Sequence, residues 1–299
     1  MKKTTIFIVF LLFIFIMSYT AEAGEDNLFF SINDAEGDDY GPGSYLYPEN
    51  EVFNDNQLFD ITKFEIEQSS INYKFIFTFK KLPDPWQSQF GFSLPLIQLY
   101  IDNRKGGATR VFDDGANVRF DSRHPWDLLL DISGWWIRLY RPEDKYKSED
   151  ALEMKKNPYD LEEALVEVED NKIYVTVSKD EIGNLIDAYI YIVVGSFDPF
   201  GPDNYRVIES EKSNWNFFDP GIKTAAPRVI DIILPSSRKQ TEVLSNYNDD
   251  YAVIYPVRIA SASESNITLL IAIIFVITIC MILLFYIVYK KLFLTNNNK

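Results

Sequence analysis

The sequence is poor in the two side chains that most often build zinc, redox and catalytic centres. It contains one cysteine, Cys280, and one histidine, His124, in 299 residues. A disulfide framework, a zinc site of cysteines and histidines, and a bis-histidine haem are therefore excluded within this chain. A Ser-His-Asp triad could use only His124, and a haem would have only His124 and Met154 as axial ligands outside the apolar segments. We expect a protein that is not an enzyme, with no catalytic residue to assign.

Basic side chains are scarce as well. Between residues 24 and 266 the sequence has 24 lysines and arginines against 43 aspartates and glutamates, a net charge of −19. Nucleic acid and anionic lipid headgroups require a basic footprint, so they are poor partners for this surface. Cations and neutral ligands such as sugars remain.

Two apolar runs lie near the ends of the sequence. Residues 1–23 contain two lysines, an apolar stretch and a small-residue end, the order typical of a secretory signal peptide; an uncleaved signal anchor is the alternative. Residues 267–289 carry no charge and are long enough to cross a bilayer as a helix. Lys290 and Lys291 follow, so the positive-inside rule makes residues 290–299 a cytoplasmic tail. We expect a single-pass cell-membrane protein whose bulk lies outside, joined to the helix by a linker at 259–266.

A period of two residues predicts β-strands in the exported part. Tyr73, Phe75, Phe77 and Phe79 alternate with more polar residues, which predicts a strand with its aromatic face inward. Residues 188–195 predict a central strand, and residues 229–234 and 252–257 are expected to close the sheet; further strands are predicted at 59–68, 95–102, 128–140 and 165–177, the last divided at Asp170-Asn171. We therefore expect one all-β domain at 28–258, an antiparallel β-sandwich followed by the C-terminal transmembrane helix.

Residues 33–48 form an acidic segment rich in turn-forming residues. It contains four acidic side chains, three glycines and two prolines, a composition typical of a loop. Asp34, Asp38 and Asp39 are spaced so that their carboxylates can converge on a hard cation such as calcium, and Asp60 and Asp102 could complete the shell from neighbouring strand ends. A solvated acidic turn is the alternative.

Several motifs in order along the chain carry a family resemblance. They are DAEGDDYGPGSYLYP (34–48), FDITKFEI (59–66), LPDPWQSQFGFSLPLIQLYID (82–102), GANVRF (115–120), HPWD (124–127), GWW (134–136), GSFDPFGPDNYR (195–206) and VIDIILP (229–235). The chain resembles the C-terminal domain of glucodextranase and its relatives, which are similar to family 9 carbohydrate-binding modules. The resemblance implies a jelly-roll-like sandwich with bound calcium that serves as a noncatalytic carbohydrate-binding or surface-attachment module. This sequence differs in that a predicted membrane helix follows the module.

Tryptophans are the candidates for stacking against sugar rings. Trp86 and Trp126 lie in loops bounded by proline, where exposure is easier, and Arg119 is a candidate partner for sugar hydroxyls. Structural packing is the alternative for each tryptophan. Trp135 and Trp136 are adjacent in a predicted strand, so one is expected in the core and the other outside.

These patterns together predict a membrane-anchored, calcium-stabilised extracellular module that binds carbohydrate or cell-envelope glycan. The alternative is a structural module that attaches to an envelope protein partner, such as a surface layer or a surface hydrolase for which it is an accessory subunit. Exposed aromatic residues around a narrow cleft would favour the first function, and a broad flat apolar patch would favour the second.

Overall fold

The computed structural model describes residues 27–111, 115–142, 159–161, 164–247 and 250–260. The predicted signal peptide, residues 261–266 of the linker, the predicted membrane helix and the tail lie outside these residues. Among the described residues, no helix has both the length and the apolar character that a membrane span requires.

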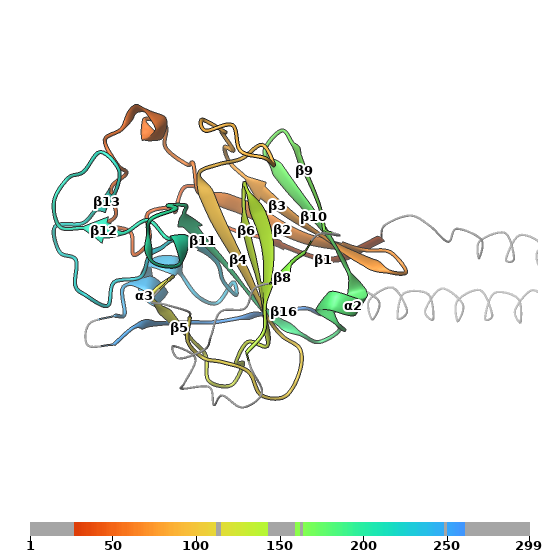
Figure 1. Cartoon of the computed structure of the whole chain (residues 1–299). Coiled ribbons are helices and arrows are strands. Elements are labelled where there is room, and N and C mark those ends of the chain that lie inside the picture. The colour runs from red at the N-terminus through yellow and green to blue at the C-terminus, as the bar shows by residue number, and fades with distance from the viewer. Residues whose placement is uncertain (1–26, 112–114, 143–158, 162–163, 248–249, 261–299) are drawn as a thin grey trace, which may run out of the picture. The chain divides into compact units, whose positions relative to one another are not determined.

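Most of the regular structure is β-strand, as predicted, and it forms two main antiparallel sheets (Figure 1). The smaller sheet has five strands, in the spatial order β1 (Asn27–Asn33), β2 (Ile61–Gln68), β3 (Asn72–Phe79), β10 (Lys172–Ser178) and β9 (Leu165–Glu169). The turn between β9 and β10 falls at Asp170-Asn171, where the sequence predicted a division.

The larger sheet runs in the order β14 (Val229–Ile233), β11 (Tyr189–Ser196), β4 (Pro95–Asp102), β6 (Leu128–Ser133), β7 (Trp136–Tyr140) and β8 (Tyr159–Asp160), and β16 (Val257–Arg258) also pairs with β11. The strand β11 is central, as predicted, because it pairs with β4 on one side and with β14 and β16 on the other. Nearly every residue of β4 and β11 is buried, since both faces of this sheet are covered.

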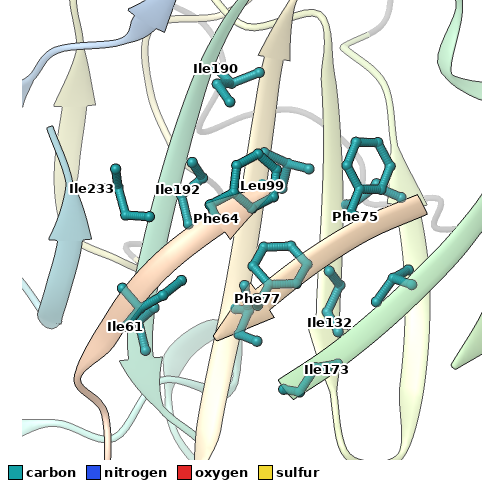
Figure 2. Packing of buried hydrophobic residues seen from close by; sticks show 14 of the residues in the cluster. Ile61, Phe64, Phe75, Phe77, Leu99, Ile132, Ile173, Ile190, Ile192 and Ile233 are labelled. Carbon is teal, nitrogen blue, oxygen red and sulfur yellow. The ribbon is translucent and has the colours of Figure 1, made fainter. Parts of the chain in front are cut away.

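The main core lies between the two sheets (Figure 2). Tyr73, Phe75, Phe77 and Phe79 of β3 are all buried, which confirms the predicted inward aromatic face. They meet aliphatic side chains of the larger sheet, among them Leu99, Ile132, Ile190 and Ile192. Each large side chain so buried contributes about 1.5 to 3 kcal/mol relative to an exposed one, which explains how the module folds without a disulfide.

A second apolar cluster covers the outer face of the larger sheet. Loops contribute to it together with β5 (Val118–Phe120), β15 (Ala252–Ile254) and α3 (Gln240–Leu244). The strand β15 pairs in parallel with β5, so the prediction that all of residues 252–257 close the main sheet is wrong for this strand. To join the main sheet, β15 would have to pair with the edge of β11 that β14 and β16 already occupy.

The remaining short elements shape the loops: η1 (Glu51–Phe53), α2 (Lys179–Ile182), η3 (Pro202–Asn204), β12 (Ile208–Glu209) and β13 (Phe217–Phe218). The helical turn α2 begins directly after Ser178. The Ser178 hydroxyl accepts a hydrogen bond from the Asp180 N–H at 3.2 Å, which satisfies a backbone donor that the helix leaves free.

Candidate functional site

A pocket of about 820 Å³ lies at the end of the larger sheet where β11 finishes. Six of its ten lining residues are aromatic: Trp86, Trp135, Trp136, Phe197, Phe200 and Trp215, accompanied by Asp198, Pro199, Arg206 and Asn216. Two of the aromatic residues are open to solvent, since Phe200 exposes 96% of its surface and Trp215 exposes 48%. A concave aromatic surface with a few polar groups is typical of a site for a small organic ligand.

The β6–β7 hairpin places two tryptophans in this pocket. Gly134 and Trp135 form its two-residue turn, and Ser133 pairs with Trp136 across it. The rings of Trp135 and Trp136 both contact Phe197, with centroids 4.7 and 5.4 Å away. The prediction that one would be core and the other outside is therefore wrong. Trp135 lies in the turn, where the alternation of a strand does not apply.

Arg206 is a buried cation beside the pocket, and its hydrogen bonds go to other groups of the protein. Its guanidinium donates to the carbonyls of Trp215 at 2.6 Å and Phe197 at 2.8 Å, and to the Ser196 hydroxyl at 3.1 Å. Its Nη1 also lies 3.7 Å from Asp198 Oδ2. Burial lowers the pKa of Arg206 and Asp198 acts in the opposite direction, but an arginine stays charged at neutral pH. Arg206 therefore ties together the two loops that carry Phe197 and Trp215.

The structure brings one of the three residues predicted to bind sugar to this pocket. Trp86 lines it, whereas Trp126 is fully buried in the second apolar cluster. The backbone of Trp126 pairs with that of Ala108, and the loop so held buries the indole despite its neighbouring proline. Arg119 lies on β5, where it forms an ion pair with Asp250 at 2.8 Å, and it does not line the pocket.

A second candidate site is a cluster of carboxylates where the acidic loop meets β14. Asp34, Asp38 and Asp231 each place one oxygen within 4.8 Å of the others. Gln240 fixes the loop there, since its side-chain amide donates to the carbonyl of Asp38 and its Oε1 accepts from the N–H of Ile232 at 2.9 Å. The arrangement joins residues about two hundred positions apart in the sequence.

Two further carboxylates adjoin this cluster, and both are fully buried. Asp60 accepts a hydrogen bond from the N–H of Gly37 at 2.8 Å. Gly37 has φ +82°, a conformation that glycine adopts without strain, so the tight turn of the acidic loop depends on it. Asp39 accepts hydrogen bonds from the Tyr47 hydroxyl and, at 3.1 Å, from the N–H of Phe59.

These carboxylates lack the partners that charged groups need when buried. Asp34 Oδ2, Asp38 Oδ1, Asp39 Oδ1 and Asp60 Oδ1 are buried oxygens with no hydrogen-bond partner. Burial, with the neighbouring Asp38, raises the pKa of Asp34 to about 8; burial raises that of Asp60 to about 6. A divalent cation would supply the missing partner and would favour the ionised carboxylates. The residues present therefore fit calcium, which prefers oxygen ligands.

Asp231 is the member of the cluster that the sequence reasoning missed. It lies in an apolar strand, VIDII, and is fully buried. The pairing of β14 with β11 shifts by one residue between Val194 and Gly195, so Ile230 is an extra residue at that point. Such a bulge changes the direction of neighbouring side chains. The sequence did contain a signal for Asp231: a charged residue inside an apolar strand is costly to bury without a partner, so it indicates a bound cation or another buried partner.

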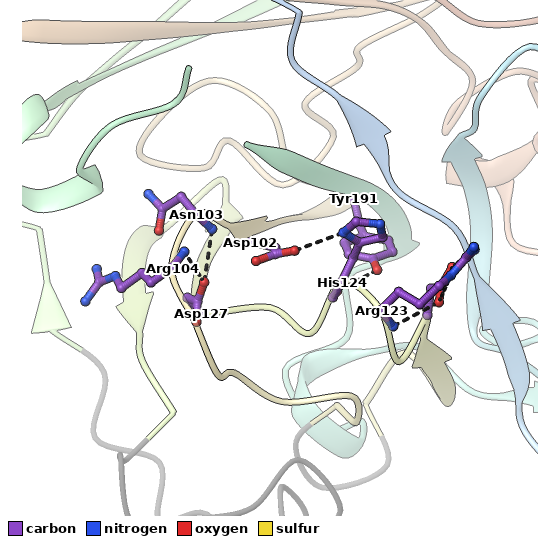
Figure 3. A network of polar contacts seen from close by, with 8 residues as sticks. Asp102, Asn103, Arg104, Arg123, His124, Asp127 and Tyr191 are labelled. Atoms are coloured by element: carbon purple, nitrogen blue, oxygen red, sulfur yellow. Dashed lines mark hydrogen bonds and ion pairs between the residues drawn. The ribbon is translucent and has the colours of Figure 1, made fainter. Parts of the chain in front are cut away.

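Asp102 lies away from the cluster, in a separate polar network (Figure 3). Its Oδ2 is 3.2 Å from His124 Nδ1, and the His124 ring stacks on Tyr189 with centroids 3.7 Å apart. Asp102 pairs with Tyr189 on β11, whereas Asp231 pairs with Val194 on the same strand. These two positions of β11 are five residues apart, which corresponds to about 17 Å along the strand. The structure therefore does not place Asp102 where it could complete the predicted calcium shell.

Residues 29–256 match one protein family, described as the C-terminal binding module, SLH-like, of glucodextranase. The match covers well over half of the 299 residues and includes both the aromatic pocket and the carboxylate cluster. No curated protein matched the chain.

Proposed function

Since the chain belongs to the family of C-terminal, SLH-like binding modules of glucodextranase, we propose that it is a noncatalytic module that binds carbohydrate in its aromatic pocket. The observation that carries the proposal is the gathering of Trp86, Trp135, Trp136 and Trp215 around one pocket. Aromatic faces stack on the C–H faces of sugar rings, and nearby polar groups orient the hydroxyls. Asn216 also lines the pocket; its Nδ2 donates to Glu209 Oε1 at 2.8 Å, so its Oδ1 is the atom that would accept a hydrogen bond from a sugar hydroxyl.

The carbohydrate is uncharged. Arg206 and Asp198 are the charged residues that line the pocket, and they neutralise each other. Arg206 is 4% exposed and its guanidinium already donates to three protein acceptors, so it is poorly placed to bind a carboxylate or phosphate of a ligand. The net charge of −19 between residues 24 and 266 further opposes an anionic polymer.

Calcium holds the acidic loop against β14 and β2. Asp34, Asp38 and Asp231 supply carboxylate oxygens, and Asp60 and Asp39 lie beside them with unpaired oxygens of their own. The ion supplies positive charge that relieves the repulsion among these acids. Its role is structural, because the aromatic pocket shares no lining residue with the cluster.

The predicted helix at 267–289 displays the module outside the cell. The N–H of Ile259 donates to the carbonyl of Ala188, which precedes β11, whereas Phe197 follows the other end of β11. The eight residues of that strand span about 26 Å. Within the module, the pocket therefore lies at the end of β11 opposite to the end beside Ile259.

The test is a binding panel with the purified full-length chain. Isothermal titration would compare neutral hexasaccharides, namely isomaltohexaose, maltohexaose, cellohexaose and xylohexaose, with anionic oligogalacturonate. We expect at least one neutral sugar to bind and oligogalacturonate to fail. Phe200→Ala and Trp215→Ala should each weaken binding about tenfold, since stacking on an aromatic residue is worth about 1 to 1.5 kcal/mol.

Ile186→Ala is the matched control. Ile186 is 55% exposed and lies in the loop before β11, at the end of the strand opposite to the pocket, so its truncation should not change affinity. Unchanged binding in both pocket variants would refute the assignment of the pocket. If no sugar binds and cell-envelope protein is captured by the same chain, the module serves in protein attachment instead.

A further inference from the structure

A row of buried polar side chains runs beneath the aromatic pocket, on the outer face of the larger sheet. Asp131 of β6 is 4% exposed, and its Oδ1 accepts a hydrogen bond from the amide of Gln98 on β4 at 3.1 Å. The Oε1 of Gln98 in turn accepts from the hydroxyls of Tyr100 and Tyr205. Polar groups at this depth require a reason, because an apolar side chain would be less costly to bury.

This row touches two parts of the pocket. The indole N–H of Trp136 donates to Asp131 Oδ2 at 3.2 Å, so the carboxylate fixes one tryptophan of the pocket by its polar edge. At the other end, Tyr205 directly precedes Arg206, and its backbone bridges to Phe197. Asp131 and Gln98 therefore connect the hairpin that carries Trp136 to the loop that carries Phe197.

We propose that Asp131 is a positioning residue for the aromatic pocket: its carboxylate orients Trp136 through the indole N–H and couples that ring, through Gln98 and Tyr205, to the facing loop. The ionised carboxylate accepts both hydrogen bonds, from Trp136 and from Gln98. Protonation removes the charge that strengthens them and leaves one oxygen carrying a proton among donors. The orientation of Trp136 thereby depends on the ionisation of Asp131.

The surroundings place this ionisation near neutral pH. Burial raises the pKa of Asp131 to about 7, the neighbouring Asp203 adds to the effect, and Arg138, paired across from Asp131 on β7, opposes it. The Arg138 guanidinium also lies 4.2 Å from the centre of the Trp136 ring. The titratable and charged groups that face Asp131 are Arg138 and Tyr140 on β7, Tyr100 on β4, Asp203 in η3 and Tyr205 immediately after it.

The test is fluorine NMR of the full-length chain labelled with 5-fluorotryptophan. The chain has five tryptophans, and each gives its own fluorine resonance. Trp136→Phe identifies the resonance of interest. We expect this resonance to move with a midpoint at about pH 7, whereas that of Trp126 stays fixed. Asp131→Asn should abolish the titration of Trp136. A static Trp136 resonance, or the same titration in Asp131→Asn, would overturn the proposal.

Asp203→Asn is a second variant that does not depend on whether Asp131→Asn folds. It removes the neighbouring acid that raises the pKa of Asp131, so the Trp136 resonance should still titrate but with a lower midpoint. A midpoint that is unchanged in Asp203→Asn would contradict the assignment of the titrating group to Asp131.

The consequence for affinity rests on the proposed carbohydrate function and is measured separately. Binding of the neutral hexasaccharide that the panel selects, for example isomaltohexaose, should weaken about fivefold from two pH units above the midpoint to two below it. The profile should be flat in Asp131→Asn. A titrating Trp136 in a chain that binds no sugar would support the positioning role and refute the carbohydrate function.

Discussion

Replacing Asp34 with asparagine should stabilise the metal-free protein and destabilise the calcium-bound one. In the absence of a cation, Asp34 is a buried acid among other acids, and its pKa is raised from 3.8 to about 8. Asparagine has no charge to bury, so the substitution removes this penalty. With calcium bound, the same substitution removes a charged ligand and weakens the site.

The magnitude follows from the pKa. Because the folded-state pKa lies above the unfolded value, protonated Asp34 favours the folded state, and stability is lost as the pH rises from 3.8 towards 8. Each pH unit within this window costs about 1.4 kcal/mol, so raising the pH from 5 to 7 should cost the metal-free protein about 3 kcal/mol through Asp34 alone. For a module of this size that corresponds to a fall in Tm of about 6 to 12 °C.

The assay is thermal unfolding of the full-length chain, followed by circular dichroism at both pH values after removal of metal and after addition of calcium. Calcium at a hundred times its dissociation constant should add about 2.7 kcal/mol at pH 7 and flatten the pH dependence. Asp34→Asn should have a higher Tm than wild type in the metal-free state at pH 7 and a lower Tm in calcium.

Glu211→Gln serves as the control, because Glu211 is an exposed acid outside the cluster. It should leave both Tm values within about 1 °C of wild type, since surface substitutions usually change stability little. Equal Tm with and without calcium in the wild-type protein, or the same sign of effect for Asp34→Asn in both states, would refute the calcium assignment.

Three further substitutions test other parts of the structure. Gly134→Ala should cost about 2 to 3 kcal/mol and weaken sugar binding, because a Cβ at that position would lie 1.7 Å from the carbonyl oxygen of Phe92; an unchanged Tm would contradict this packing. Arg206→Lys should lower the Tm and the sugar affinity together, since the lysine ammonium cannot reproduce the guanidinium donors that reach three acceptors. Unchanged sugar binding in this variant would show that the two loops do not depend on these hydrogen bonds. Arg119→Ala should change stability by less than about 1 kcal/mol and leave sugar binding intact, because Arg119 forms a partly exposed ion pair with Asp250 away from the pocket; a loss of affinity in titration would restore it as a sugar-binding candidate.

The sequence by itself determined the β-sandwich, because local pattern decides which residues form strands. The alternation at Tyr73 to Phe79 predicted both the strand β3 and its buried face, and the structure confirms both. The acidic loop at 33–48 likewise predicted a gathering of carboxylates, since four acids, three glycines and two prolines cannot form a regular element. The quoted motifs also identified the family, which the match over residues 29–256 confirms.

The tertiary structure alone decided which residues share a site. A bulge directs Asp231 to the acidic loop, whereas the register of β4 leaves Asp102 some 17 Å along the sheet, about five residues away. The same is true of the pocket, where a two-residue turn aligns Trp135 with Trp136 and a backbone pair buries Trp126. Strand pairing and turn geometry join residues distant in the chain, and no local periodicity encodes those contacts. The sequence therefore predicted the kinds of side chain that the sites use, and the fold selected which of them meet.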